Sequence, residues 1–441
     1  MVAARPQRYP GLLESVAVTE TAVAGERYDL LPICSGEVLC ATAADRSGEG
    51  FLAELDRRWR ALSLSDPPPA SPEADPPGDA LPFRGGWLIY LGYELAAEIE
   101  PRLVLPESPD PFVGLAFRAP AAWLRDRSRG RAWLIAEQGF EGLLEEFLAD
   151  VTAFGEPPDA APPLPAVEIE EEDPGRFLQA VRRALEYTAA GEVYQTNLSR
   201  RWSGTAIEPL DPVALYQRLR MANPSPFAAL LRYGEFAVQS SSPERLLSIR
   251  GDRVSTRPIA GTRPRGATAR ADAELVSTLL RDEKERAEHV MLIDLERNDL
   301  GRVCRGGTVE VDEFMSIETY AHVHHIVSNV RGRLRAGVSP VEALRAVFPG
   351  GTITGCPKVR CMQIIAELEG GGRGAYTGSI GYLNRDGSAD FNILIRTFTT
   401  HGPRLAFRAG AGIVADSQPE RELAETRAKA KGLLRALGRD P

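Results

Sequence analysis

Apolar residues recur three and four positions apart in several segments of this 441-residue chain, which is the spacing of an amphipathic helix. The segment 174–191 shows this spacing most clearly, and the glycine at its end supplies a helix stop. The same spacing predicts helices over 271–295, 357–369 and 419–438, and a shorter helix that begins at Val341.

Shorter runs in which apolar and polar residues alternate predict β-strands. Two of these runs contain Trp123 and Trp133 and flank an Arg-Gly turn. Further strands are expected over 192–202, 375–383 and 392–399. Because the strands come in hairpins and the helices are grouped between them, the pattern favours an α+β fold with large antiparallel sheets over a wound β-α-β fold.

Two segments, 66–82 and 156–165, are rich in Pro, Asp and Ala and have the composition of linkers. They predict an N-terminal region over residues 1–165 and a second domain over residues 170–441. All of the residue patterns that suggest chemistry fall after residue 190, in the second of these units.

The composition excludes several classes of protein. The chain has 52 Lys and Arg against 61 Asp and Glu, a net charge of −9, which argues against nucleic-acid binding or attachment to an anionic membrane. No apolar run is long enough for a membrane span or a signal peptide, and the five cysteines form no CxxC pair. We therefore expect a soluble, cytoplasmic protein with no nucleic-acid or membrane partner.

Two pairs of glutamates have the spacing that places both carboxylates on one helix face: Glu285 with Glu288, and Glu422 with Glu425. One such pair surrounded by other charges is typical of a solvated helix face. Two pairs that converged would instead supply the oxygen ligands that Mg²⁺ takes.

Three of the five histidines fall close together, at His322, His324 and His325. A zinc site lacks support because no cysteine or carboxylate stands nearby at a suitable spacing. An imidazole that acts as a general acid or base is better motivated, since it titrates near neutral pH. Hydrogen-bonded structural roles are expected for His322 and His324.

Glycine-rich segments predict turns where backbone amides approach a ligand. Residues 348–358 (FPGGTITGCPK) lack the GK[ST] of a phosphate loop but lead into a helix N-terminus that suits an anion. Residues 409–414 (AGAGIV) and 257–266 (RPIAGTRPRG) are also expected to be turns, and Arg396 is expected in a buried strand. Together with the acidic pairs, these features suggest a small dicarboxylate that undergoes metal-assisted substitution and elimination.

Several blocks resemble the chorismate-utilising enzymes, and they occur in the family's order. They are SSSPERL, RPIAGTRPRG, DEKERAEHVMLIDLERNDLGRV, HHIVS, GGTITGCPKVRCMQII, GSIGY, NILIRT, GAGIVADS and ELAETRAKA. The resemblance covers roughly residues 175–438 and is to anthranilate synthase component I and aminodeoxychorismate synthase component I, and more distantly to isochorismate and salicylate synthases. It implies two large antiparallel sheets packed as a sandwich with flanking helices, and chorismate as the substrate.

The resemblance also implies a role for individual residues. The Mg²⁺ ligands would be Glu285, Glu288, Glu422 and Glu425; the catalytic group His325, Glu244 and Thr352; and the substrate-binding group Gly261, Thr262, Tyr376, Arg396, Gly410, Ala411, Gly412 and Lys429. An N-terminal block, YPGLLES, resembles the effector-binding corner of anthranilate synthases and places an effector or structural ligand at Ser15.

Three features resemble the para-aminobenzoate branch of the family: Asn197 in VYQTNLSRR, Gly350-Gly351 before the TIT, and FNILIRT. They imply an aminodeoxychorismate synthase component I, which adds ammonia at C4 of chorismate. Ala260 points to the alternative, anthranilate synthase, because many aminodeoxychorismate synthases carry a lysine at that position. A non-catalytic relative that only binds a dicarboxylate is a third reading, against which the intact Glu, His and Arg positions argue.

Both branches take ammonia from a glutaminase. None of the five cysteines stands in a G-x-C-x-G context, the nucleophile motif of such an amidotransferase. The resemblance therefore implies a separate glutaminase subunit as partner.

Overall fold

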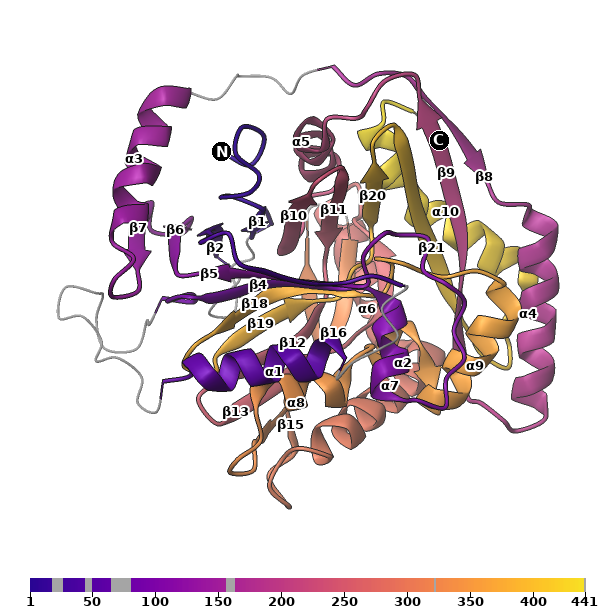
Figure 1. Ribbon diagram of the computed structural model, residues 1–441. Helices are drawn as coiled ribbons and strands as arrows, with labels where there is room; N and C mark the ends of the chain where they lie inside the picture. Colours follow the sequence, from indigo (N-terminus) through magenta and orange to yellow (C-terminus); the bar gives the residue numbers. More distant parts are fainter. Residues whose placement is uncertain (18–26, 44–49, 65–80, 156–162, 321–322, 440–441) are drawn as a thin grey trace.

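The computed structural model describes residues 1–17, 27–43, 50–64, 81–155, 163–320 and 323–439. In these residues two large antiparallel sheets pack face to face, with helices on their outer sides (Figure 1). The predicted α+β sandwich is therefore confirmed. The linker segments predicted from composition fall largely on 65–80 and 156–162, outside the described residues.

The first sheet has 11 described strands. Their order is β17 (Gly355–Cys356), β9 (Gln195–Ala206), β21 (Arg404–Ile413), β20 (Thr397–His401), β11 (Phe236–Ser242), β10 (Phe227–Tyr233), β1 (Gly11–Glu14), β2 (Tyr28–Ile33), β6 (Ala121–Asp126) and β7 (Arg131–Ala136), and β8 (Val167–Glu171) also pairs with β9. The hairpin predicted around Trp123 and Trp133 is β6 and β7.

The second sheet has 10 described strands. Their order is β14 (Ile259–Pro264), β16 (Val323–Arg333), β13 (Arg253–Arg257), β12 (Arg245–Arg250), β19 (Ala389–Asn392), β18 (Ser379–Asn384), β4 (Gly86–Leu91), β5 (Gly114–Ala119) and β3 (Val38–Ala41), and β15 (Glu310–Thr319) pairs with β16. Strands from the two sides of residue 165 are neighbours in both sheets: β1 pairs with β10, and β4 pairs with β18.

The described residues contain ten α-helices. They are α1 (Phe51–Leu62), α2 (Ala96–Ile99), α3 (Gly142–Phe154), α4 (Pro174–Ala189), α5 (Pro212–Ala222), α6 (Ala269–Arg281), α7 (Glu283–Gly301), α8 (Pro340–Val347), α9 (Lys358–Glu369) and α10 (Pro419–Ala436), with short 3-10 turns η1 (Tyr93–Leu95) and η2 (Gly351–Ile353). The helices α4, α8, α9 and α10 confirm the predictions at those places.

Three apolar layers hold the sandwich together. Side chains of both sheets, such as Leu124, Val238 and Phe117, fill the space between them. The helices α1, α7 and α8 cover the outer face of the second sheet, and α5 and α10 cover the outer face of the first, against Trp202 and Phe407. Burial of this apolar surface is the main force that stabilises such a layered fold.

The single long helix predicted over 271–295 is wrong, because the structure contains two helices that meet at Asp282. Asp282 has an extended backbone, and its carboxylate accepts a hydrogen bond from the amide of Glu285 at 3.3 Å. An aspartate that caps the first turn of a helix favours a new start at that place. The spacing of apolar residues continues across this position and so does not predict where one helix ends and the next begins.

Two of the predicted strands are also shorter than expected. Residues 375–378 form a turn before β18, and residues 393–396 lie between β19 and β20 rather than in a strand. Arg396 has φ 52°, a left-handed backbone that ends any strand pattern. The prediction that Arg396 lies in a strand is therefore wrong.

Candidate active site

The first part of the site lies where β14 pairs with β16. In this register Thr262 is opposite His325, and the threonine hydroxyl oxygen lies 2.9 Å from Nδ1 of the imidazole. Gly261 has φ 65°, and the register shifts between Ala260 and Thr262, which marks a β-bulge. The turn predicted over 257–266 is wrong, because most of this segment is strand.

His325 is buried, with 2% of its surface exposed, and burial lowers the pKa of its imidazole to about 3. The nearby charges of Arg396 and Lys429 lower it further. The ring is therefore neutral at physiological pH, and its Nε2 has no hydrogen-bond partner among the described residues. A buried nitrogen of this kind is available to a ligand.

The histidine next to it has a structural environment. Nδ1 of His324 lies 2.9 Å from the Thr319 hydroxyl, and its Nε2 lies 2.8 Å from the Asp272 carboxylate. Both ring nitrogens are thus occupied, as expected for a structural histidine. His322 lies outside the described residues.

Glu244 lies in the short connection between β11 and β12. Burial raises the pKa of its carboxyl group to about 7, while the Thr352 hydroxyl and the charges of Lys429 and Arg396 act to lower it. A carboxyl group with a pKa near the working pH can donate a proton and take it back. A carboxyl group with this pKa is suited to the acid or base role expected of Glu244.

The glycine-rich segment 409–414, predicted as a turn, lies instead mostly within β21. Gly412 is opposite Asn197 and Gly410 is opposite Ser199, so the backbone of residues 410–412 is paired with β9. The ammonium group of Lys429 donates to the Gly410 carbonyl at 2.9 Å and pairs with Glu425 at 2.7 Å.

Glycine is required at these positions because other side chains occupy the space of a Cβ. A Cβ at Gly410 would lie 2.6 Å from the Tyr376 hydroxyl oxygen and 2.9 Å from Oδ1 of Asn197. A Cβ at Gly412 would meet the carboxamide of Gln195. Gln195 and Asn197 lie on the same face of β9, two residues apart.

Buried polar atoms without a hydrogen-bond partner among the described residues gather in these strands and loops. They are Oε1 of Glu244, Oγ1 of Thr352, Nε2 of His325, Oε1 of Gln195 and Oδ1 of Asn197. Thr352 links the group, because it acts on the pKa of Glu244 and its carbonyl accepts a 3.5 Å contact from Asn197. Since buried polar groups normally have partners, these atoms are suited to bind water or a polar ligand.

The carboxylates expected to bind Mg²⁺ stand on two helices, α7 and α10. Glu285 reaches the site: a Cβ at Gly261 would lie 3.1 Å from its Oε2, while its Oε1 accepts from Arg263 at 3.0 Å. Their oxygen donors fit the chemistry of Mg²⁺. In the described part of the chain, however, no three His, Cys, Asp or Glu side chains stand close enough to hold a metal ion.

One acidic group near Glu244 was missed by the sequence analysis. Burial raises the pKa of Glu296 on α7, and the charges of Asp299 and Glu244 raise it further. Asp299 in turn forms an ion pair with Lys358, whose ammonium also donates to the Val347 carbonyl at 3.0 Å. Glu296 lies two helical turns after Glu288, a spacing that could have indicated it.

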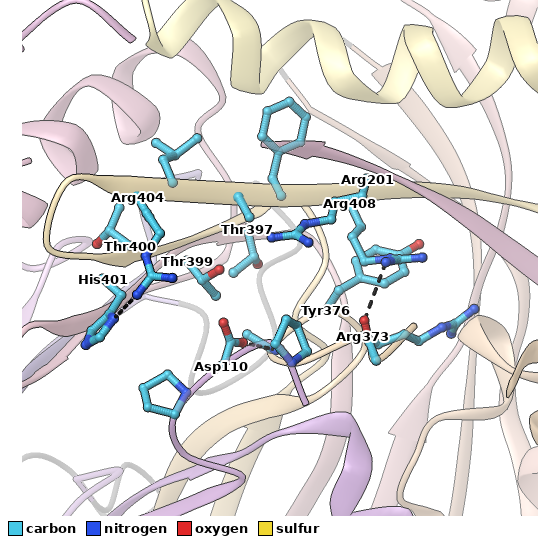
Figure 2. Close-up of a pocket in the computed structure, with 17 residues that line it drawn as sticks. Asp110, Arg201, Arg373, Tyr376, Thr397, Thr399, Thr400, His401, Arg404 and Arg408 are labelled. Atoms are coloured by element: carbon cyan, nitrogen blue, oxygen red, sulfur yellow. Dashed lines mark hydrogen bonds between the residues drawn. The ribbon is translucent and has the colours of Figure 1, made fainter. Parts of the chain in front are cut away.

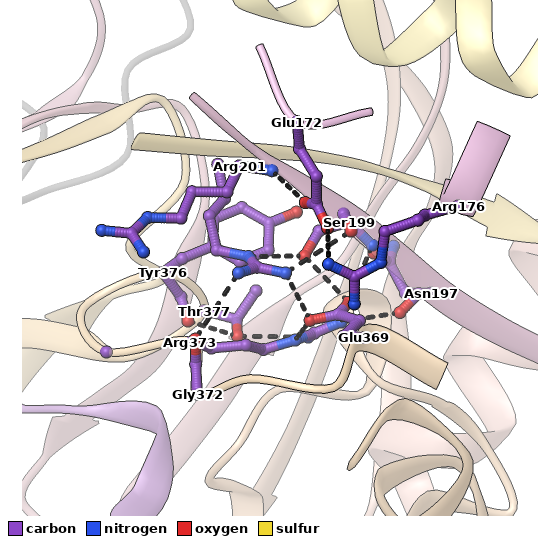
Figure 3. A network of polar contacts seen from close by, with 12 residues as sticks. Glu172, Arg176, Asn197, Ser199, Arg201, Glu369, Gly372, Arg373, Tyr376 and Thr377 are labelled. Atoms are coloured by element: carbon purple, nitrogen blue, oxygen red, sulfur yellow. Dashed lines mark hydrogen bonds and ion pairs between the residues drawn. The ribbon is translucent and has the colours of Figure 1, made fainter. Parts of the chain in front are cut away.

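A buried ionic network supports the loop that carries Tyr376 (Figure 3). The Glu369 carboxylate accepts from Arg373 at 2.6 Å, from Arg408 at 2.8 Å, and from the amide and hydroxyl of Ser199 at 2.8 Å. Arg373 also donates to the Asn197 carbonyl at 2.7 Å. The network fixes the position of β9 relative to residues 373–377.

Two further features are cavities, the first of which shares Arg373, Tyr376 and Arg408 with this network. One has a volume of about 110 Å³, and Figure 2 shows Arg201, Arg404 and Arg408 around it, with Tyr376 at its edge. The other has a volume of about 60 Å³ and is lined by Ser15, the predicted effector position, together with Tyr382 and other residues.

Comparisons with known proteins show the family to which the chain belongs. The model of the family described as chorismate binding enzyme matches residues 23–435, and the chain belongs to that family. Aminodeoxychorismate synthase component 1 of Bacillus subtilis is 45% identical over 371 residues, which cover 80% of this chain and 77% of that protein. Anthranilate synthase component 1 1 of Haloarcula marismortui is 40% identical over 433 residues, which cover 91% of this chain and 88% of that protein.

The structural comparison gives the same result. The crystal structure of anthranilate synthase component I from Streptococcus pneumoniae superimposes with a TM-score of 0.78 at 30% identity, over 94% of this chain and 93% of that one. The chain is thus a chorismate-utilising enzyme with the fold of anthranilate synthase component I. Within the described residues we find no helix that is long and apolar enough to cross a membrane.

Proposed function

We propose that this protein is an aminodeoxychorismate synthase component I, which replaces the C4 hydroxyl of chorismate with an amino group for para-aminobenzoate and folate synthesis. The observation that carries the proposal is the group of unpartnered buried polar atoms, which includes Asn197 beside Gly410 and Thr352. Asparagine at position 197 is one of the features in which the sequence resembles this branch.

The proposed role of each residue follows from its charge or its protonation state. Arg396 and Lys429 supply positive charge for the carboxylates of chorismate. Glu244, with a pKa of about 7, donates a proton to the departing hydroxyl, which leaves as water. The neutral His325 contacts the same oxygen through Nε2. After ammonia has bonded to the ring carbon, its extra proton returns to Glu244, so that chorismate and ammonia give the amino product and water.

Mg²⁺ is part of the proposal, with Glu285, Glu288, Glu422 and Glu425 as its ligands together with substrate oxygens. When bound, the metal would supply Lewis-acid polarisation of the substrate. Glu285 lies against the bulge at Gly261, and in the described residues no three His, Cys, Asp or Glu side chains stand close enough to hold a metal ion, so we expect metal and substrate to bind together.

Ammonia would come from a separate glutaminase subunit. The relatives named above carry the designation component 1, which fits a chain that works with a second component. We also propose an effector or structural ligand in the cavity beside Ser15.

A second function, anthranilate synthase component I, is favoured by Ala260. Alanine on β14 cannot form the covalent bond to the ring that a lysine could form there. If the chain follows that branch, it aminates C2 and eliminates pyruvate.

The identity of the reaction product distinguishes aminodeoxychorismate synthase from anthranilate synthase. Purified protein is incubated with chorismate, Mg²⁺ and ammonium, and the products are separated and identified by mass. We expect 4-amino-4-deoxychorismate, which becomes para-aminobenzoate only when a separate lyase is added. Direct formation of fluorescent anthranilate would establish the alternative, and unchanged chorismate absorbance would overturn both.

A further inference from the structure

The turn before β18 is held by two carboxylates from the N-terminal part of the chain. Oε1 of Glu94 accepts from the amide of Arg373 at 2.6 Å and from that of Gly374 at 3.2 Å. Oδ2 of Asp110 accepts from the next amide, that of Ala375, at 2.7 Å (Figure 2). Three successive backbone amides are therefore bound by side chains that lie 265 to 280 residues earlier in the sequence.

The backbone of this turn is strained. Thr377 has φ 64°, in the left-handed region that a β-branched residue rarely adopts. Gly374 has φ 60°, and a Cβ there would lie 2.2 Å from Oδ2 of Asp110. The Gly374 carbonyl also accepts from the amide of Tyr93 at 2.8 Å. A strained conformation persists where its neighbours determine it, and the two carboxylates are among those neighbours.

Both carboxylates bind the turn from positions where a charge is costly. Burial raises the pKa of the Asp110 carboxyl group to about 6 and that of Glu94 to about 7, whereas the amides of the turn act to lower both values. Charge-assisted hydrogen bonds to backbone amides offset part of this cost, and they are stronger than bonds between neutral groups. The two acids therefore fix the orientation of one short backbone segment strongly.

Tyr376 directly follows the three bound amides. The centre of its ring lies 5.5 Å from the guanidinium carbon of Arg373, and its hydroxyl oxygen lies 2.6 Å from the place of a Cβ at Gly410. Gly410 belongs to the segment of β21 that is expected to bind substrate. A small rotation of the turn would therefore move the hydroxyl away from that segment.

We propose that Glu94 and Asp110 are positioning residues that hold the hydroxyl of Tyr376 toward chorismate. The inference rests on the proposed function, but it applies to amination at either C4 or C2 because both reactions begin with the same bound substrate. Neither carboxylate touches the substrate in this scheme, since each acts through the backbone amides of the turn.

The test measures binding of chorismate by titration calorimetry, with Mg²⁺ present and without ammonium so that no amination takes place. The variants are Glu94→Ala, Asp110→Ala, Tyr376→Phe and the double variant Asp110→Ala/Tyr376→Phe, with Asp110→Asn as the conservative variant that keeps an oxygen acceptor. Glu98→Ala is the matched control, because its carboxylate also accepts from a backbone amide, that of Leu52 at 2.9 Å, but at the start of α1.

We expect the Kd for chorismate to rise about tenfold in Tyr376→Phe, the effect of one lost hydrogen bond, and by a similar factor in Glu94→Ala and Asp110→Ala. Asp110→Asn and Glu98→Ala should stay within about threefold of the wild type. In the double variant the loss should remain close to that of Tyr376→Phe alone, since a hydroxyl that is absent cannot be misplaced.

Multiplied losses in the double variant would overturn the proposal, because independent effects add in free energy. Wild-type affinity in both Glu94→Ala and Asp110→Ala, or an equal loss in Glu98→Ala, would overturn it as well. So would the absence of a cooperative thermal transition in both alanine variants of the turn, since the two carboxylates would then serve the fold as a whole.

If only one of these two variants fails to fold, the other decides, with Glu94→Ala/Tyr376→Phe as the second double variant. The binding measurement does not depend on turnover. A wild-type protein that binds chorismate but forms no aminated product would therefore contradict the proposed function and leave the result on Tyr376 standing.

Discussion

The hydroxyl oxygen of Thr262 lies 2.9 Å from Nδ1 of His325, across a β-bulge at Gly261. This contact orients a neutral, buried imidazole so that its Nε2 remains available. In the described strands the side-chain hydrogen bond of Thr262 is with the histidine, so we propose that Thr262 positions the imidazole.

Replacement of Thr262 by valine should lower kcat about tenfold, the effect of one hydrogen bond in the transition state, and should leave the KM for chorismate nearly unchanged. Valine keeps the β-branched shape that suits a strand but cannot accept or donate a hydrogen bond. The matched control Thr262→Ser keeps the hydroxyl and should restore most of the activity. Equal losses in both variants would contradict a positioning role.

Glu244→Gln should lower kcat by about 10²–10⁴-fold, because a carboxamide cannot transfer a proton to the leaving hydroxyl. In the wild type the acid form is present below a pKa of about 7, so kcat should fall as pH rises through that value. Rates are compared at constant free ammonia. A wild-type profile that stays flat between pH 6 and 9 would remove Glu244 from this role.

Glu425→Gln should abolish Mg²⁺-dependent turnover if the acidic pairs bind the metal. The control is Glu420→Gln on the same helix, an exposed residue that pairs only distantly with Arg182 at 3.4 Å. Both proteins are assayed over a Mg²⁺ titration, with a chelator as the baseline. Wild-type rates for Glu425→Gln would mean that the carboxylates on α10 are a solvated helix face.

The helices and several members of the site could be predicted from the sequence because these features are local. Apolar spacing located α4, α8, α9 and α10, and short motifs located Glu244, Thr262 and His325. Each motif places its residue at a fixed point of one strand or loop, and the structure brings Thr262 and His325 into contact.

Contacts between distant segments could not be predicted in the same way. Glycine content suggested a turn at 409–414, yet Gly410 and Gly412 lie in a strand whose partner side chains, Asn197 and Gln195, fill the space of a Cβ. The sequence of residues 409–414 alone does not show that side chains of another strand occupy the space of a Cβ there. Linker composition likewise could not indicate that β1 and β4 pair with strands beyond residue 165.

Glu369→Ala should destabilise the fold by about 3–5 kcal/mol, because it leaves the buried guanidinium groups of Arg373 and Arg408 without their carboxylate. Glu367→Ala on the same helix is the control, since that side chain is exposed. Urea unfolding of the two variants measures the difference. A loss below about 1 kcal/mol, the upper range for a surface pair, would contradict the importance of the network.

Glu94→Gln should flatten the dependence of stability on pH. Burial raises the pKa of Glu94 from its ordinary value of 4.5 to about 7, even though its Oε1 accepts from the amides of Arg373 at 2.6 Å and Gly374 at 3.2 Å. A group whose pKa is higher in the folded state contributes stability that is complete below pH 4.5 and is lost as pH rises through 7. Glutamine resembles the protonated acid at every pH. The urea midpoint of the wild type should therefore fall relative to that of the variant between pH 5 and pH 8, and parallel curves for the two proteins would show that Glu94 titrates normally.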